Sequence, residues 1–379
     1  MMKARGVMKF RIASYNVENL FERPAVMNLP DWSDGKPVLD NYAKLNDLLQ
    51  KPTYTADDKQ KILALLKALG LGKSDESKYV ILRQNRGHLL KRPKSGAPVV
   101  VANGRGDWIG WLELKWETVN ETALATTGRV IRDVDAQIQG VVEVEGRVAL
   151  KGFNEQFVGK DGGRPYEHVM VIDGNDERGI DVGLMTRGDF PIVSMRSHVD
   201  DMSGANPIFS RDCAEYEIGL PGGDSLWILM NHFKSKGYGD QKTSNAKRKL
   251  QADRTLAIYQ DRLKAGAALI SVMGDFNDTS DSAPLAGLLA AKTGLRDIFE
   301  HPKFAGDGRP GTFGNGAKSN KIDFILLSPE LWKRVTGGGV FRKGVWGGKN
   351  GTLFPHYPEI TKAEEAASDH AAIWAELNL

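Results

Sequence analysis

Six apolar stretches of this sequence each carry, at or near one end, a side chain capable of chemistry. These side chains are Asn16, Glu143, His232, Asp275 with Asn277, Asp323, and Asp369 with His370. A carboxylate that closes an apolar strand must be paired, bound to a cation or exposed to water, because burying it alone is unfavourable. Two acids and an amide can hold a divalent cation, and an Asp–His pair can act as an oriented general base. One shared site explains the six features together.

The stretch from Ser271 to Asp278 gives the strongest single indication. It is expected to be a buried strand, 267–273, followed by Gly274-Asp275-Phe276-Asn277. Such a strand end puts a carboxylate and a carboxamide on one rigid platform, which suits a hard cation or a phosphoryl group attacked by water. The alternative is an Asp/Asn turn that only caps the strand. The other polar strand ends favour the site.

His232 follows another apolar strand, 225–230, and precedes Lys234 and Lys236. Isolated histidines are usually structural, but this one offers a proton donor with two cations beside it for a phosphate. Residues 231–250 hold six Lys or Arg and one acid. We therefore expect Lys234 and Lys236 to bind substrate.

Periodic patterns of apolar residues predict the elements that position these groups. Strands are expected at 10–15, 138–144, 168–172, 180–186, 225–230, 267–273, 319–327 and 371–377, and helices at 41–50, 55–71, 121–137, 246–264 and 283–291. The glycine-rich residues 337–367 are expected to form a long surface loop of a kind that is often functional. Residues 173–179 resemble part of a calcium loop but lack the spacing of an EF-hand.

The segment 73–117 combines basic and aromatic residues. Residues 73–94 hold seven Lys or Arg and two acids, and Trp108, Trp111 and Trp116 follow. A hairpin is expected between 98–102 and 108–116. Basic residues beside aromatics suit an arm that binds a nucleic-acid strand. The alternative is a solvated ribbon with its tryptophans packed in the core.

Composition sets wider bounds. The net charge of +3 allows a phosphate-bearing partner without requiring one. Cys213 is the only cysteine, so an intrachain disulfide and a cysteine-based zinc site are both excluded. No apolar run is long enough to span a membrane, and no signal-peptide pattern opens the chain. We expect a cytoplasmic protein that acts without a membrane or an obligate protein partner.

Six short motifs carry a resemblance to a known family. They are Ser14-Tyr15-Asn16-Val17, Val142-Glu143-Val144-Glu145, Met230-Asn231-His232, Gly274-Asp275-Phe276-Asn277, Lys321-Ile322-Asp323-Phe324 and Ser368-Asp369-His370. In this order they resemble the endonuclease/exonuclease/phosphatase superfamily, which includes DNase I-like and exonuclease III-like nucleases, and in particular its bacterial members. The resemblance implies one domain, 1–379, built as a four-layer α/β sandwich with two packed mixed β-sheets and the site between them.

The resemblance also implies roles for these residues. Glu143 would be the principal ligand of Mg²⁺ or Mn²⁺ (or Ca²⁺), with Asn16 beside it and Asp369 joining through water. Asp275 and Asn277 would position or deprotonate the attacking water. Asp323 would orient His370 on the scissile phosphate, and His232 would lie near the leaving group. Arg178, in a stretch similar to bacterial members, is a candidate phosphate contact.

Two departures from the family pattern stand out. Val142 replaces the usual Gln before the metal-binding Glu, and 127 positions separate Asn16 from Glu143, with the excess in the basic segment 73–117. The predicted function is divalent-metal-dependent phosphodiester hydrolysis, as a nuclease acting on DNA or RNA. The alternative is a phosphodiesterase or phosphatase for small-molecule or lipid phosphoesters. A non-catalytic binding protein is disfavoured, because it would have no need of Asp275, Asp323 and His370 together.

Overall fold

The computed structural model describes residues 8–21, 24–26, 29, 32–116, 120–176, 178–236 and 240–378. The first seven residues, the last residue of the predicted segment 73–117, and Glu177 of the 173–179 stretch lie outside this part. The chain forms two compact units. The first comprises residues 1–21, 120–235 and 244–379, and the second comprises residues 22–119 and 236–243. No helix in the described ranges is both long and apolar enough to cross a membrane.

Two mixed β-sheets form the centre of the first unit. The larger, of seven strands, has the order β16 (Phe304–Ala305), β18 (Val335–Phe341), β19 (Ala372–Asn378), β1 (Lys9–Asn16), β6 (Ile138–Val144), β8 (Asp181–Thr186), β7 (His168–Ile172). The smaller, of six strands, has the order β15 (Arg296–Asp297), β17 (Asp323–Leu327), β14 (Leu269–Asp275), β13 (Ser225–His232), β12 (Cys213–Gly219), β9 (Ile192–Arg196). Both sheets are mixed, because β1–β6 and β13–β14 are parallel pairs among antiparallel ones.

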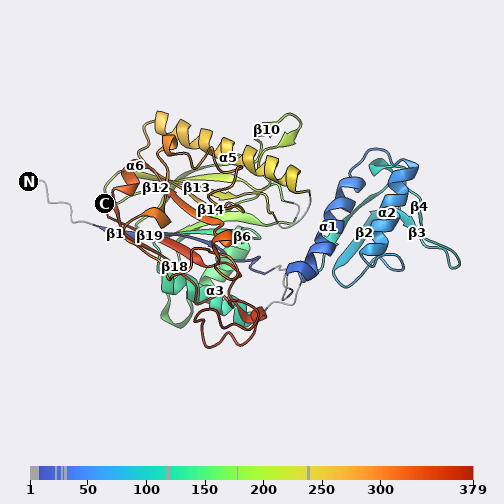
Figure 1. Ribbon diagram of the computed structural model, residues 1–379, viewed down its shortest axis with the longest axis horizontal. Coiled ribbons are helices and arrows are strands. Elements are labelled where there is room, and N and C mark those ends of the chain that lie inside the picture. Colours follow the sequence, from blue (N-terminus) through green and yellow to red (C-terminus); the bar gives the residue numbers. More distant parts are fainter. Residues whose placement is uncertain are drawn as a thin grey trace, which may run out of the picture. The chain divides into compact units, whose positions relative to one another are not determined.

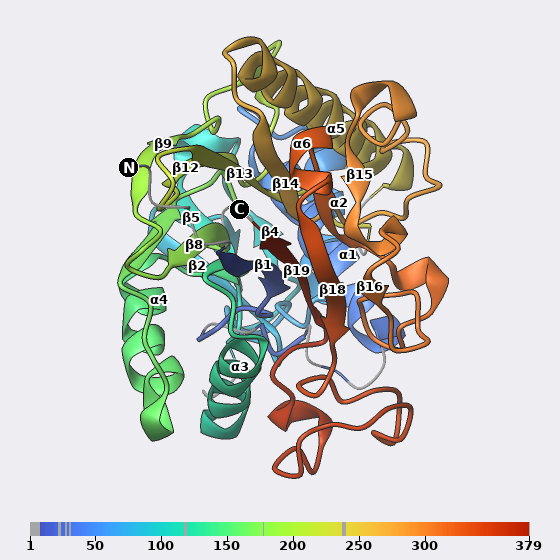
Figure 2. The ribbon, with the colours of Figure 1, turned by 90° about the vertical axis from the view of Figure 1, so that its left-hand side faces the viewer.

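The inner faces of the sheets pack on each other through one apolar core, to which Ile12, Val142, Met230, Met273 and Ile325 contribute. Helix α3 (Glu121–Val134) and helix α4 (Arg147–Phe153) cover the outer face of the larger sheet. Helix α5 (Gln241–Lys264) covers the outer face of the smaller one, and the short α6 (Pro329–Trp332) lies at its end. Figures 1 and 2 show α3 and α5 on opposite sides of the strands. The predicted four-layer DNase I-like fold is confirmed.

Capping residues explain where α3 begins and ends. This helix covers part of the outer face of the larger sheet. The Asn120 side chain accepts hydrogen bonds from the backbone N–H groups of Thr122 and Ala123, so it caps the first turn. Asp135, in the left-handed conformation, ends the helix. Val130 and Val134 recur at helical spacing on its buried face and pack against the sheet.

The second unit has its own core. Helices α1 (Trp32–Leu49) and α2 (Ala56–Ala68) pack with the antiparallel pair β2 (Val80–Arg86) and β5 (Ile109–Leu114) and with the pair β3 (Leu90–Lys91) and β4 (Val99–Val100). Trp108 is buried and donates its indole N–H to the Tyr54 hydroxyl at 3.1 Å. Trp111 and Trp116 are exposed. The basic segment is therefore part of a larger folded unit that begins before it.

Several predicted elements differ from the structure. The hairpin between 98–102 and 108–116 is wrong, because 109–114 pairs with the alternating strand Val80–Arg86, which offers two buried apolar partners, Val80 and Leu82. Residues 283–291 form turns rather than a helix. Residues 337–341, predicted as loop, belong to β18. Helix α1 begins nine residues earlier than expected, at Trp32, and includes Pro37.

Candidate active site

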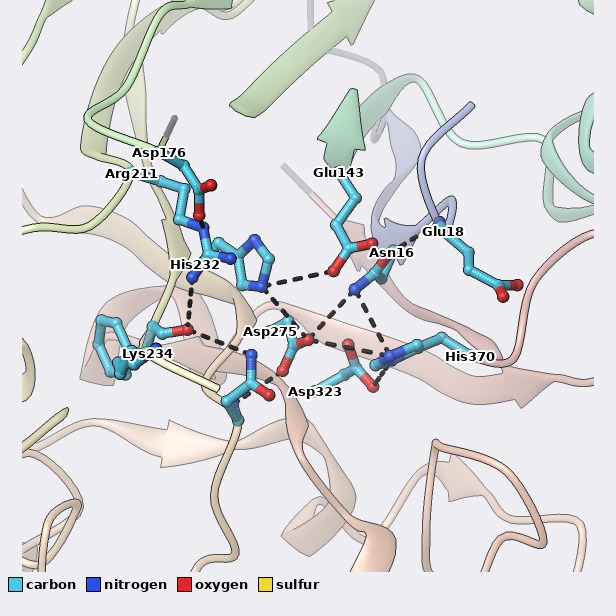
Figure 3. A network of polar contacts seen from close by, with 12 residues as sticks. Asn16, Glu18, Glu143, Asp176, Arg211, His232, Lys234, Asp275, Asp323 and His370 are labelled. Atoms are coloured by element: carbon cyan, nitrogen blue, oxygen red, sulfur yellow. Dashed lines mark hydrogen bonds and ion pairs between the residues drawn. The ribbon is translucent and has the colours of Figure 1, made fainter. Parts of the chain in front are cut away.

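Three neighbouring strands of the smaller sheet bring three of the predicted residues together. His232 on β13 lies directly opposite Asp275 on β14, and Asp275 lies directly opposite Asp323 on β17. All three side chains are buried. Strand pairing alone therefore places an imidazole and two carboxylates side by side at one end of the sheet (Figure 3).

A phenylalanine follows each of these residues and packs on the opposite face of the sheet. The rings of Phe233 and Phe276 stack at 4.8 Å between centroids, and those of Phe276 and Phe324 also stack at 4.8 Å. Side chains alternate between the two faces of a strand, so this register is the same one that aligns the polar groups. The aromatic stack fixes the three strand ends relative to one another.

The facing sheet supplies Asn16 and Glu143. Asn16 ends β1 opposite Val142 of β6, and Glu143 is the extra residue where the β6–β8 register shifts. The Glu143 backbone has φ +65°, a left-handed conformation unusual for a residue with a side chain. Bulges of this kind redirect a side chain, and backbone strain of this kind is concentrated at functional sites. The Glu143 carboxylate lies 3.6 Å from Nε2 of His232.

The Gly-Asp-Phe-Asn turn has a backbone that few residues allow. Gly274 has φ +133°, and a Cβ there would lie 1.9 Å from the carbonyl oxygen of Asn231. Asn277 has φ +52°, its backbone N–H donates to Oδ1 of Asp275 at 2.8 Å, and its amide donates to the Phe233 carbonyl at 3.2 Å. Asn277 thus holds the Asp275 carboxylate and ties the two strand ends together.

His370 forms an oriented pair with Asp323. Its Nδ1 lies 2.9 Å from Oδ2 of Asp323, so Nδ1 carries a proton and Nε2 faces the site. Nε2 lies 3.7 Å from Oδ1 of Asp369 and 3.9 Å from Oδ2 of Asp275. The Ser368 hydroxyl accepts from the His370 backbone N–H and donates to the Asn16 carbonyl, which joins this loop to the end of β1.

Asn16 bridges the groups of both sheets. Its amide nitrogen donates to Oδ2 of Asp275 at 3.2 Å and lies 3.5 Å from Nε2 of His370. Its amide oxygen accepts from the backbone N–H of Glu18 at 2.9 Å. Asn16 would have to release Glu18 to offer that oxygen to a cation, so its contacts here are those of an orienting residue.

Burial and neighbouring charges shift the pKa values of Asp275, His232 and His370 in different directions. Burial, then the neighbouring Asp323 carboxylate, raises the pKa of Asp275 to about 7. Burial lowers the pKa of His232 well below its ordinary value, and the positive Arg211 adds to this effect. Burial opposes the charged form of His370, but the carboxylates of Asp323 and Asp369 outweigh it and raise its pKa well above the ordinary value. At neutral pH His370 is charged and His232 is neutral.

An ion-pair cluster that the sequence did not reveal flanks His232. Asp176 lies between two arginines, with Nη2 of Arg178 and Nε of Arg211 each 2.9 Å from its Oδ2. Nη1 of Arg211 also donates to the Phe233 carbonyl at 3.2 Å. Asp176 and Arg211 therefore tie the predicted phosphate contact Arg178 to the strand that carries His232. Figure 3 shows Asp176 and Arg211 beside His232. Asp176 lay within the 173–179 stretch, but Arg211 follows no periodic pattern that would single it out.

The predicted lysines occupy different units. The backbone of Lys234, just beyond β13, is bonded to the side chains of Gln251 and Arg248 of α5. Lys236 belongs to the second compact unit. The substrate-binding roles of both remain predictions.

Two sets of side chains have donor atoms close enough to share a cation. Glu143, His232 and Asp275 form one set and Asp275, Asp323 and His370 the other, each within 4.8 Å. Asp323 and His370 already neutralise each other as a pair. The first set has two carboxylates from facing sheets and an imidazole whose low pKa leaves a nitrogen lone pair available. That donor set fits a divalent cation.

Comparison with known proteins identifies the family. A family model described as the endonuclease/exonuclease/phosphatase family matches residues 108–334. The chain belongs to this family. The expected superfamily is thereby confirmed, and its members are hydrolytic phosphoesterases that generally depend on divalent metal ions. No curated protein matches the chain.

Two solved structures show the same fold at low sequence identity, and a third is a weaker match. An endonuclease/exonuclease/phosphatase family protein from Bacteroides thetaiotaomicron is 16% identical, with a TM-score of 0.53 over 98% of each chain. An endonuclease/exonuclease/phosphatase from Beutenbergia cavernae is 13% identical, with a TM-score of 0.50 over 98% of this chain and 72% of that one. A mannosyl-6-phosphatase from Bacteroides thetaiotaomicron is 19% identical, with a TM-score of 0.49 over 68% of this chain and 91% of its own.

Proposed function

We propose that this protein hydrolyses phosphodiester bonds of DNA or RNA with a divalent cation, Mg²⁺ or Mn²⁺. The observation that supports this most is the position of Asp275. Its Oδ2 faces the pair of Glu143 and His232 on one side and the pair of Asp323 and His370 on the other. A hydrolytic site needs a base, a cation site and a phosphate-binding charge in one place, and these five residues provide that combination.

Glu143 is the proposed principal ligand of the cation, which would lie beside Asp275 and His232. Asn16 is proposed to lie beside the cation and to orient Asp275, and Asp369 to join through water. When bound, the cation supplies Lewis-acid polarisation of a phosphoryl oxygen.

Asp275 is the proposed general base. With a pKa raised to about 7, it can accept a proton near neutral pH. Oδ1 is held by the backbone N–H of Asn277. Oδ2 accepts from the Asn16 amide and, with its second lone pair, is proposed to take the proton of a water molecule as the water oxygen attacks phosphorus. The P–O ester bond then breaks in line with the attack.

His370 is proposed to bind a non-bridging phosphoryl oxygen through Nε2. Asp323 keeps that imidazole charged and aimed into the site, so it stabilises the negative charge that builds up in the transition state. His232 is proposed to lie near the leaving oxygen. Because its pKa is low, we assign it a neutral hydrogen-bonding role rather than that of a charged proton donor.

Arg178, Lys234 and Lys236 are the proposed contacts to further phosphates of the substrate. A polymer presents phosphates at regular intervals, and the basic residues of 231–250 and 73–94 suit such a substrate better than a single small phosphoester. This pattern is why we place nucleic acid ahead of the small-molecule alternative.

A hydrolysis panel tests the proposal. Supercoiled plasmid, single-stranded DNA, RNA and bis-p-nitrophenyl phosphate are incubated with the wild-type protein and Asp275→Asn in Mg²⁺, in Mn²⁺ and in EDTA. Asp224→Asn, an exposed Asp in the turn before β13, serves as the matched control. We expect metal-dependent cleavage of a nucleic acid that is lost in Asp275→Asn and kept in the control. Hydrolysis of bis-p-nitrophenyl phosphate alone would refute the nuclease assignment.

A further inference from the structure

The positive charge of this chain is concentrated in the second compact unit. Residues 22–119 and 236–243 contain eighteen Lys or Arg and thirteen Asp or Glu, a net charge of +5. The whole chain carries +3, so the first unit, which holds the candidate active site, carries −2. A long polyanion would therefore be attracted first to the second unit.

The β2–β5 ribbon of this unit has one buried face and one solvent-exposed face. Leu82 and Leu112 lie opposite each other on the inner face and pack in the core with α1 and α2. By strand alternation the outer face carries Arg83 opposite Trp111, with Ile109 two residues before Trp111. Figure 1 shows the helices and strands of this unit.

The outer face leaves two large apolar side chains exposed to water. Trp111 is 47% exposed and Ile109 is 48% exposed. Of the eleven large apolar side chains that are exposed in the described part of the chain, five lie between Val99 and Trp116. A concentration of this kind is typical of an interaction surface.

Two arginines border the exposed indole. Glu113 holds the Arg83 guanidinium in place through two hydrogen bonds, at 2.8 and 3.0 Å. Arg86, opposite Ile109, is exposed and has no ion pair with any residue that the structure describes. An aromatic plane beside fixed and free guanidinium groups matches a base with its adjoining phosphates.

We propose that the outer face of the β2–β5 ribbon binds single-stranded nucleic acid, with a base stacked on Trp111 and phosphates at Arg83 and Arg86. The proposal deepens the proposed function and rests on it, since it names the substrate form. A duplex keeps its bases stacked inside and would offer none to the indole. A second copy of this chain is a poorer occupant, because two units of +5 repel each other.

The test is fluorescence anisotropy of labelled dT20 and rU20 with the full-length protein in EDTA, where no cleavage occurs. We expect Trp111→Ala to weaken binding roughly ten-fold, as the loss of one stacked base predicts, and Trp111→Phe to retain most of it. Arg86→Ala should weaken binding and lower the salt dependence by about one phosphate contact. The matched control is Met202→Ala, which removes an equally exposed side chain from the first unit and should change nothing.

The proposal is overturned if Trp111→Ala binds dT20 and rU20 as tightly as the wild-type protein. It is also overturned if the wild-type protein binds neither strand, or if Trp111→Ala converts a dimer to a monomer in analytical ultracentrifugation. Hydrolysis of bis-p-nitrophenyl phosphate, measured in parallel, should be unchanged in Trp111→Ala. A protein that binds strands through Trp111 but hydrolyses no diester would support this inference while refuting the proposed function.

Discussion

Asp275→Asn should abolish hydrolysis and at the same time stabilise the metal-free protein. The pKa of Asp275 is about 7 in the folded protein and close to 3.8 when the chain is unfolded. A carboxyl whose pKa is raised by folding takes up a proton on folding. Its contribution therefore makes the protein less stable as the pH rises from about 4 to about 7, and this loss is complete above that range.

The size of the effect follows from the two pKa values. A carboxyl with these values destabilises the folded state by about 4 kcal/mol at pH 8 but by less than about 2 kcal/mol at pH 5. Asparagine resembles the protonated acid in shape and carries no charge. The free energy of unfolding of the variant should therefore exceed that of the wild-type protein by about 2 to 3 kcal/mol more at pH 8 than at pH 5.

Urea unfolding in EDTA at pH 5, 6, 7 and 8 measures this difference directly. The other buried acids with raised pKa values, Asp181 and Asp212, are common to both proteins and cancel in the comparison. Asp224→Asn, exposed in the same unit, should follow the wild-type curve. If the wild-type and Asp275→Asn curves run parallel across this pH range, Asp275 is not a buried carboxyl with a raised pKa.

Four further substitutions test other parts of the site. Asp323→Asn and His370→Ala should each lower kcat by about 10²- to 10⁴-fold, because both remove the oriented positive charge. The kinetics of bis-p-nitrophenyl phosphate hydrolysis measure this effect, and an unchanged kcat would contradict the prediction. Glu143→Gln should raise the Mg²⁺ concentration for half-maximal activity by at least about ten-fold, and an unchanged metal titration would remove Glu143 from the cation site. Gly274→Ala should destabilise the protein by more than about 3 kcal/mol in urea unfolding, since its Cβ would overlap the Asn231 carbonyl; Gly152→Ala, which meets no atom within 4 Å, is the matched control.

Sequence patterns predicted the strands of the site well because each site residue lies at or close to one end of a strand with a clear apolar run. Asp275 and Asp323 could be assigned to strand ends from spacing alone. The direct alignment of Asp275 and Asp323 with His232 depends on the register of β13, β14 and β17. The stacked phenylalanines that follow these three residues fix that register. The sequence does contain this signal, because Phe233, Phe276 and Phe324 each directly follow a site residue.

Other features depend on contacts that no local pattern reveals. Arg211 joins Asp176 across a long stretch of chain, and neither residue sits in a periodic segment. The strained backbone of Glu143 arises from a register shift between β6 and β8, which cannot be deduced from β6 itself. The pairing of β5 with β2 rather than β4 was decided by burial of the shared apolar face in the core of the second unit.

The most direct test asks whether Asp275 is the base of a metal-dependent nuclease. Cleavage of a 5′-labelled single-stranded oligonucleotide in Mg²⁺ is followed in parallel for the wild-type protein, Asp275→Asn and Asp224→Asn. We expect the wild-type protein and Asp224→Asn to cleave the strand at similar rates, EDTA to stop both, and Asp275→Asn to leave the strand intact. Cleavage by Asp275→Asn at the wild-type rate, or cleavage that persists in EDTA, would contradict this expectation.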